Sequence, residues 1–371
     1  MAFSVQHSAF SLSRVSMLRE MRDAAGDSGE FYTPRAVVRL MVAVTDPRLG
    51  ETVLDPASGT GGFLVEAFNH LSQQVKTVAD RKILQETSLF GCEPKTLPYL
   101  LCQMNLLLRG LDAPQIDLGN SLRFKLTDIG ERDRVDVILT NPPFGGEEEK
   151  GIQGNFPEDK QTAETALLFL QLIMRKLRKS RTGFQPVTSS QKTGKMPVLR
   201  YARAAVVVPN GTLFGDGVCA RIKEEREFNL HTIVRLPNGV FAPYTSIPTN
   251  LLFFDRSGPT REVWYYEQPL PKGRKNYTKT ARIQFEEFAP LIAWWDQPGP
   301  GTKRKKNEQA WKVPAAELLA NGCNLDRKNP RAKEDITHLP PAQLAASILK
   351  KEQRIAEIMG NIGKLLAKHG T

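Results

Sequence analysis

The sequence is poor in cysteine and histidine, and neither residue type is arranged as a ligand set. Its 371 residues include four cysteines, Cys92, Cys102, Cys219 and Cys323, and five histidines. The cysteines form no C-x-x-C pair and the histidines show no ligand spacing. Zinc centres and disulfide frameworks use such residues at short, regular spacings. The sequence therefore predicts no metal site and no disulfide framework, and this pattern fits a reducing cytoplasm.

Long apolar runs and an acidic excess are also missing. No apolar stretch approaches the roughly 20 residues that a membrane-spanning helix needs, so we expect no membrane partner. The chain has 51 Lys and Arg against 40 Asp and Glu, a net charge of +11. Such a balance suits a polyanionic partner, although many solvated proteins carry a similar excess. Hydrophobic residues make up 40% of the chain, which is enough for one large domain and a smaller appendage.

A glycine-rich turn follows an early apolar segment, but it lacks the spacing of a phosphate-binding loop. Residues 53–64 read VLDPASGTGGFL. They match neither G-x-x-x-x-G-K-[ST] nor G-x-G-x-x-G, and no lysine follows to hold phosphates. Small residues let a ligand approach the backbone, and the N-terminus of the following helix suits a carboxylate. We therefore expect a ligand with a carboxylate and an ammonium, with Asp55 near the ammonium.

An acidic residue ends the next apolar segment, 89–93. In open α/β sheets, an acid at the end of a strand commonly binds ribose hydroxyls, which indicates this role for Glu93. The glycine-rich turn alone is weak evidence for a nucleotide-like ligand. The turn followed by an acid at a strand end is stronger evidence.

The tetrapeptide Asn141-Pro142-Pro143-Phe144 closes a further apolar run, 135–140. The Asn141 side-chain oxygen and the Pro142 carbonyl can accept hydrogen bonds from an exocyclic amino group, which frees a lone pair on its nitrogen. The prolines restrict the backbone, so these acceptors are aimed in advance. Phe144 offers a flat face on which an extruded base can stack. Taken alone, the tetrapeptide fits a strand that ends in a proline turn equally well, and the upstream turn favours amino-group chemistry.

Together these segments resemble the adenine-N6 DNA methyltransferases that use S-adenosylmethionine. They are most similar to the modification subunits of type I restriction-modification systems. The similarity runs from about Met17 to the C-terminus, and includes GEFYTPR at 29–35, GCE at 91–93 and FAPYTSIPTN at 241–250.

The resemblance implies two sets of site residues. The implied catalytic residues are Asn141, Pro142, Pro143 and Phe144. The implied residues for binding S-adenosylmethionine are Phe31, Tyr32, Thr33, Pro34, Asp55, Ala57, Gly59, Thr60, Gly61, Glu93 and Asn120. Many relatives have an aspartate at the position of Asn120, and an asparagine can still exchange hydrogen bonds with adenine.

Alternating strand and helix patterns predict an α/β fold with a mostly parallel, Rossmann-like sheet and ligands at the carboxyl ends of the strands. Strands are predicted at 52–54, 89–92, 135–140, 204–208, 232–236 and 250–254, and helices at 61–72, 95–108, 163–177 and 217–227. Segments 251–254 and 263–266 are predicted to form a β-hairpin that closes the seven-stranded sheet implied by the resemblance.

We expect three parts along the chain. Residues 1–28 are a remnant N-terminal helical segment, and residues 29–275 are the catalytic domain, with an insertion loop at 178–202. Residues 276–371 are a C-terminal extension that ends in an amphipathic helix at 341–368. The relatives carry a helical domain before the first cofactor motif, so the chain resembles a truncated modification subunit.

The resemblance also implies a set of partners. These are double-stranded DNA, a specificity subunit, a restriction subunit and a second copy of the modification subunit. Two alternatives stay open: a protein glutamine-N5 methyltransferase, which shares the Asn-Pro-Pro chemistry, and a non-catalytic cofactor-binding or assembly fragment. Phe144 and the long C-terminal region disfavour the first, and the intact motifs disfavour the second.

Overall fold

The computed structural model describes residues 32–179, 201–214, 226–295, 304–331 and 341–369. They belong to two compact units, one ending at Pro330 and the other beginning at Arg331. The predicted N-terminal segment 1–28, Phe31, most of the insertion and most of the predicted helix 217–227 lie outside the described residues.

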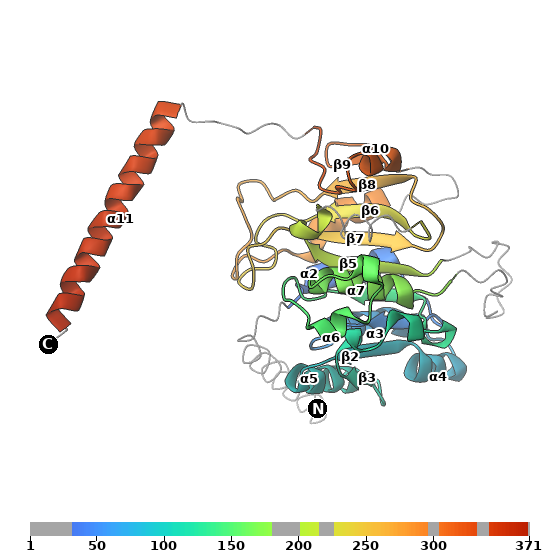
Figure 1. Ribbon diagram of the computed structural model, residues 1–371. Coiled ribbons are helices and arrows are strands. Elements are labelled where there is room, and N and C mark those ends of the chain that lie inside the picture. The colour runs from blue at the N-terminus through green and yellow to red at the C-terminus, as the bar shows by residue number, and fades with distance from the viewer. Residues whose placement is uncertain (1–31, 180–200, 215–225, 296–303, 332–340, 370–371) are drawn as a thin grey trace, which may run out of the picture. The chain divides into compact units, whose positions relative to one another are not determined.

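The first unit contains a nine-stranded sheet in the order β3-β2-β1-β4-β5-β7-β6-β8-β9 (Figure 1). Neighbours from β3 to β5 are parallel, whereas β7 runs antiparallel to both β5 and β6. The strands are β1 (Val53–Asp55), β2 (Leu89–Glu93), β3 (Gln115–Leu118), β4 (Val137–Thr140), β5 (Arg203–Pro209), β6 (Asn229–Arg235), β7 (Thr249–Asp255), β8 (Glu262–Glu267) and β9 (Ala310–Pro314).

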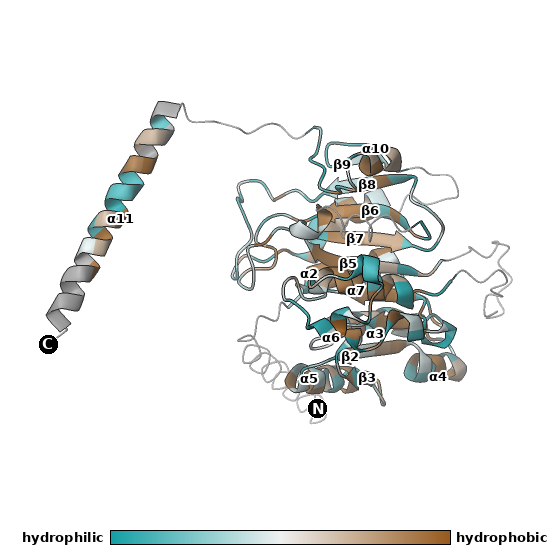
Figure 2. Ribbon diagram, viewed as in Figure 1, coloured by the Kyte–Doolittle hydropathy of each residue, from teal (hydrophilic) through white to brown (hydrophobic). Residues whose placement is uncertain are grey.

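Both faces of the sheet are covered. In β4, Val137 and Leu139 point into one core while Ile138 points into the other. Such continuous apolar runs are typical of parallel strands buried on two sides, and the strands are correspondingly hydrophobic in Figure 2. Helices α2, α3, α4, α5 and α9 contribute to the first core, and α7 and α10 to the second. The helices of this unit are α2 (Arg35–Thr45), α3 (Gly62–Ser72), α4 (Val78–Thr87), α5 (Thr96–Leu107), α6 (Lys150–Gln153), α7 (Thr165–Lys176), α9 (Ala289–Trp295) and α10 (Ala315–Ala320).

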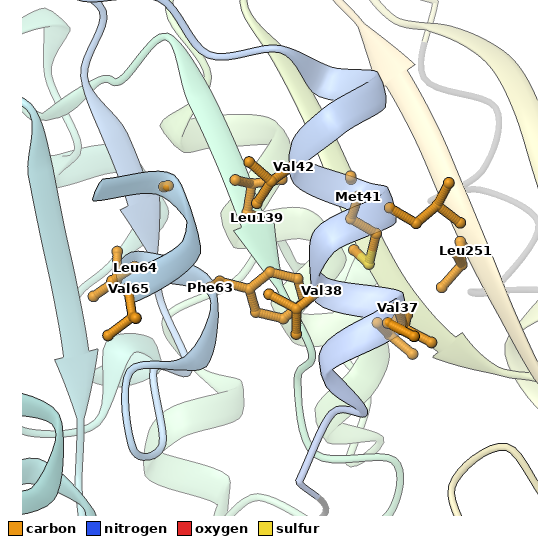
Figure 3. Close-up of a cluster of buried hydrophobic side chains, with 14 of the residues drawn as sticks. Val37, Val38, Met41, Val42, Phe63, Leu64, Val65, Leu139 and Leu251 are labelled. Carbon is orange, nitrogen blue, oxygen red and sulfur yellow. The ribbon is translucent and has the colours of Figure 1, made fainter. Parts of the chain in front are cut away.

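Helix α2 lies against the sheet and begins directly after Tyr32, Thr33 and Pro34, which the resemblance assigns to cofactor binding. Val37, Val38, Met41 and Val42 recur on one face of the helix, as an amphipathic helix requires. Figure 3 shows them against side chains of α3, β4 and β7, among them Phe63. Pro34 is the N-cap residue of α2. Burial of α2 therefore fixes where the preceding residues Tyr32 and Thr33 lie.

Arg203, the first residue of β5, holds the other end of α2. Its guanidinium pairs with both oxygens of Glu51, at 2.9 and 2.8 Å. It also donates to the carbonyls of Thr45 and Asp46, at 2.7 and 2.9 Å, which are among those that a helix C-terminus leaves without intrahelical partners. The two charged side chains are only 14% and 13% exposed, so this bidentate pair is largely shielded from water.

The predicted hairpin between 251–254 and 263–266 is wrong, although the antiparallel closing strand exists. Every residue of β7 pairs with β5, and on its other side β7 pairs with β6. β8 instead pairs in parallel with β6. A simple hairpin would have satisfied the backbone groups along one edge of β7, whereas its place between β5 and β6 satisfies both edges.

Residues 276–330, the first part of the predicted C-terminal extension, belong to the same compact unit as the sheet. The reason is β9, which pairs with β8 in antiparallel register. Trp311 of β9 stacks on Tyr265 of β8, with ring centroids 5.3 Å apart and an interplanar angle of 11°. The sheet consequently has two strands beyond the expected seven.

The second unit contains helix α11, Pro341–His369, where the sequence predicts a helix at 341–368. Several of its large apolar side chains are exposed: Ile348, Leu349, Ile355, Ile358, Met359 and Ile362. No helix in the described part of the chain combines the length and the apolar composition of a bilayer-spanning segment.

The contacts of Arg203 with Glu51 and with the end of α2, here called the Arg203 clamp, yield a stability prediction. Arg203→Ala should lower the free energy of unfolding by about 3–5 kcal/mol, because Glu51 and the carbonyls at the end of α2 lose their partner in a shielded place. The matched control is Lys312→Ala, whose ion pair with Glu262 is about 40% exposed and should contribute less than about 1 kcal/mol. Urea unfolding measures both, and equal losses would contradict the clamp.

Candidate functional site

A cavity of about 600 Å³ opens at the edge of the sheet where the first four strands end. This volume is typical of small-molecule sites. Asp55 ends β1, Glu93 ends β2, Asn120 follows β3 and Asn141 follows β4, and all four line the cavity. The parallel strand pairing thus gathers residues from distant parts of the chain.

Most of the predicted site residues meet at this cavity. Those that line it are Tyr32, Thr33, Pro34, Asp55, Ala57, Gly59, Thr60, Glu93, Asn120, Asn141, Pro142 and Pro143. Gly61 and Phe144 are not among the lining residues, and Phe31 lies outside the described part of the chain.

The glycine-rich turn between β1 and α3 is held by backbone hydrogen bonds. Ser58 N donates to the Cys92 carbonyl at 3.0 Å, and Gly61 N donates to the Ser58 carbonyl at 2.7 Å. Gly61 has φ +82°, and a Cβ there would lie 2.7 Å from the Sγ of Cys102. Gly61 therefore serves the site indirectly, because it lets the turn pack closely on α5.

Glu93 connects the turn to β2. Its Oε2 accepts from Gly59 N at 2.9 Å and its Oε1 from Lys95 N at 3.0 Å. A carboxylate oxygen has lone pairs for more than one donor, so both oxygens can also accept from ligand hydroxyls. Asn120 is similarly oriented, since its Oδ1 accepts from Leu122 N at 2.9 Å.

Asp55 is a deeply buried acid of the cavity. It is 1% exposed, and its Oδ1 accepts from Ala57 N at 3.1 Å. Burial raises the pKa of Asp55 to about 7, against the lowering effects of the nearby Thr140 side chain and of the Ala57 amide, and the charge of Glu93 raises it further. A ligand ammonium beside Asp55 would favour the ionised carboxylate, because opposite charges stabilise each other.

The ring of Phe144 packs against the first core and does not line the cavity. It is half-buried and meets Phe241 edge to face, with centroids 5.7 Å apart and an interplanar angle of 62°. Stacking of a base on Phe144 therefore stays a prediction. A second aromatic pair does reach the cavity: Tyr32 and Tyr244 both line it, with centroids 5.7 Å apart.

Helix α5 and the turn directly after it, which contains Arg109, supply lining residues that the sequence reasoning missed. Leu101, Asn105 and Arg109 all line the cavity, and Asn105 Nδ2 donates to the Thr60 carbonyl at 2.8 Å. Their spacing of four residues, directly after the strand that ends in Glu93, was a usable signal. Lys95, Glu148, Phe169 and Arg282 also line the cavity and had no comparable local signature. Among the described residues, no three His, Cys, Asp or Glu side chains are grouped as a metal site would require.

Comparison with known sequences identifies the family. The sequence profile of the N-6 DNA methylases matches residues 16–184 and 198–338. This chain belongs to the N-6 DNA methylase family. It is also 48% identical over 355 residues to the type I restriction enzyme EcoEI methylase subunit of Escherichia coli, an alignment that covers 94% of this chain and 67% of that subunit.

Two solved structures are similar over most of the chain. One is a modification subunit assigned to a type I restriction enzyme from Vibrio vulnificus YJ016, with 61% identity and a TM-score of 0.78, covering 90% of this chain and 67% of that one. The other comes from work on complex assembly and conformational transition of the type I restriction-modification system, with 40% identity and a TM-score of 0.76, covering 97% and 71%.

The N-6 DNA methylase assignment confirms the predicted mixed α/β methyltransferase fold and the predicted relation to type I modification subunits. The predicted adenine-N6 methyltransferase function is confirmed at the level of the family, which favours it over the protein-glutamine alternative. The chain spans 67% of the EcoEI subunit, and 55% of three further type I methylase subunits from Escherichia coli and Salmonella that are 28% identical to it.

The close approach at Gly61 can be tested with its neighbour as control. Gly61→Ala should lower the free energy of unfolding by about 2–5 kcal/mol, because the new methyl group meets Cys102 and the left-handed φ is strained. Gly62→Ala should change stability by at most about 1 kcal/mol, because a Cβ there meets nothing within 4 Å. Denaturant unfolding of both variants measures the difference, and similar losses would contradict this role of Gly61.

The raised pKa of Asp55 yields a pH prediction. The folded state holds a proton on Asp55 up to about pH 7, whereas the unfolded chain releases it near pH 4. The free energy of unfolding of the wild type should therefore decrease as the pH rises from about 4 to about 7, and Asp55→Asn should remove this decrease. Relative to the wild type, the free energy of unfolding of Asp55→Asn should therefore be about 2–3 kcal/mol higher at pH 8 than it is at pH 5.

The control for this pH dependence is Asp80→Asn. Backbone hydrogen bonds lower the pKa of Asp80, so this carboxyl is ionised in both states across the range. Its substitution should have the same effect on the free energy of unfolding at pH 5 and at pH 8. A difference for Asp55→Asn that does not vary with pH would show that Asp55 is already charged in the folded protein.

Proposed function

We propose that this chain transfers the methyl group of S-adenosylmethionine to N6 of adenine in DNA, as the modification subunit of a type I restriction-modification system. One observation carries the proposal: the glycine-rich turn after β1 and the Asn141-Pro142 acceptors line a single cavity. A methyl donor held at the turn and an amino group held at Asn141 would therefore face each other.

The residues at the turn fit S-adenosylmethionine. Asp55 is buried and its pKa is raised to about 7, so the methionine ammonium would favour its ionised form. Glu93 is placed to accept from ribose hydroxyls, and Asn120 to exchange hydrogen bonds with the adenine ring. Thr33 and Pro34 line the cavity at the start of α2, where they would contact the methionine end. When bound, the cofactor supplies a methyl group on a positively charged sulfur.

Asn141 and Pro142 supply the orientation that an amino nucleophile needs. Their oxygens accept the two amino hydrogens, which turns the nitrogen lone pair towards the methyl group. Pro142 is buried, and the strand before it, β4, is buried at every residue. These acceptors therefore sit on a rigid support.

The cationic residues of the cavity suit a DNA backbone. Arg35, Lys95, Arg109 and Arg282 all line it, and the chain as a whole carries a net charge of +11. Lysine and arginine at such positions neutralise phosphates with little regard to sequence. Recognition of a specific target is accordingly assigned to a partner.

We assign as partners double-stranded DNA, a specificity subunit, a restriction subunit and a second modification subunit. The EcoEI relative is itself a subunit of a restriction enzyme, and a structural relative was solved within a study of complex assembly. The exposed apolar side chains of α11 suit a helical docking surface, because a helix gains most of its stability from a packed apolar face.

Titration of the purified chain with S-adenosylmethionine by calorimetry tests the cofactor assignment. Saturable binding is expected, and a folded chain that binds none would overturn the proposed function. Asn141→Ala should then leave the affinity for S-adenosylmethionine nearly unchanged and reduce methyl transfer to DNA by about 100-fold or more. Asn229→Ala, at the opposite edge of the sheet, is the matched control and should leave both quantities unchanged. Equal loss of binding and transfer in Asn141→Ala would contradict the role of Asn141.

A further inference from the structure

The loop that follows the catalytic tetrapeptide is folded back onto helix α7. Glu147 forms an antiparallel bridge with Glu164, and the next residue, Glu148, donates its backbone N–H to the Ala163 carbonyl at 3.0 Å. The Glu148 carbonyl accepts from Gln153 Nε2 at 2.6 Å. The backbone of Glu148 is therefore held on both sides.

Glu148 differs from the two glutamates beside it. Glu147 and Glu149 are exposed, whereas Glu148 is half-buried and lines the cavity. Its Oε1 accepts from Thr165 Oγ1 at 3.3 Å. Phe169, one turn further along α7, lines the same cavity. The fold thus selects one of three adjacent carboxylates and directs it inward.

The other two acids of the cavity lie at the end assigned to the cofactor. Asp55 accepts from Ala57 N, and both oxygens of Glu93 accept from backbone amides. Glu148 instead belongs to the loop that continues from Asn141 and Pro142, and within the described residues its Oε2 accepts no hydrogen bond. Glu148 thus has a carboxylate oxygen that accepts no hydrogen bond from any described residue, in the cavity that the amino-group acceptors Asn141 and Pro142 also line.

We propose that Glu148 is a further catalytic residue, which stabilises the positive charge that reaches N6 and accepts the proton that N6 releases. The proposal rests on the function proposed above. Methyl transfer forms a bond between N6 and the methyl carbon and breaks the bond between that carbon and sulfur, whose electron pair stays on sulfur. N6 is left with two hydrogens and one positive charge. One of these hydrogens passes as a proton to Glu148 Oε2 and then to water, which leaves a neutral methylated amino group.

Asn141 and Pro142 cannot perform this task. An amide oxygen and a backbone carbonyl accept hydrogen bonds but are too weakly basic to take up a proton near neutral pH. A carboxylate beside them stabilises the developing charge before the proton moves, and general bases in such positions typically contribute 100-fold or more to the rate.

A binding measurement tests the charge of Glu148 without turnover. Sinefungin carries a protonated amine in place of the sulfonium and its methyl group, whereas S-adenosylhomocysteine is neutral there. The wild-type chain should prefer sinefungin, and Glu148→Gln should reduce the ratio of the two affinities by about tenfold. Glu148→Asp keeps the charge and should retain most of the preference. Glu147→Gln and Glu149→Gln are the matched controls and should match the wild type.

A rate measurement completes the test. The rate of single-turnover methylation is measured on a duplex with one adenine opposite an abasic position. The unpaired adenine is easier to extrude from such a duplex. Glu148→Gln should slow this transfer by about 100-fold, and both exposed-glutamate controls should leave it unchanged. If Glu148→Gln keeps the sinefungin preference and the rate of the wild type, the role of Glu148 is overturned while the proposed function stands. If the wild type binds neither nucleoside, or transfers no methyl group even with its specificity subunit present, the proposed function fails and the role of Glu148 with it.

Discussion

Strand β1 pairs in parallel with β2 on one side and with β4 on the other, and the whole site depends on this arrangement. Val53 is in register with Leu89 and with Val137, so the turns that follow β1 and β4 leave the sheet at the same edge. In open α/β sheets a crevice forms where connections diverge from a central pair of strands. β1 has only three residues, yet hydrogen bonds along both edges fix it within the sheet.

Close packing behind the crevice is as important as the residues that line it. A Cβ at Gly91 in β2 would lie 2.8 Å from Leu64 of α3 and 2.8 Å from Ile116 of β3. The start of α3 can therefore approach the sheet closely enough for Gly59 N to reach Glu93. Asp55, which is in register with Gly91, is buried at the same turn, and this burial raises its pKa.

Local patterns predicted much of this structure because local forces determine it. The helix expected at 163–177 is observed at Thr165–Lys176, and the turn at 55–61 follows from its glycines. The partner of β7 was mispredicted because pairing between distant strands leaves no local trace when every strand is apolar. Tyr32 and Tyr244 come together from opposite ends of the domain for the same reason. The inward direction of Glu148 depends on Ala163 and Thr165, which have no sequence feature that distinguishes this glutamate from its neighbours.

Arg178 and Arg203 anchor the chain at the amino ends of β4 and β5. Arg178 N donates to the Val135 carbonyl at 2.9 Å and Arg178 Nη1 to Asp136 Oδ1 at 2.8 Å, while Arg203 secures the start of β5. Both flanks of residues 180–200 are thus anchored at the edge of the sheet opposite the cavity. Because both anchors lie at the edge opposite the cavity, a change in chain length between them is not expected to move the residues that line the cavity. The same position offers a permissive point for grafting a reporter or an affinity module.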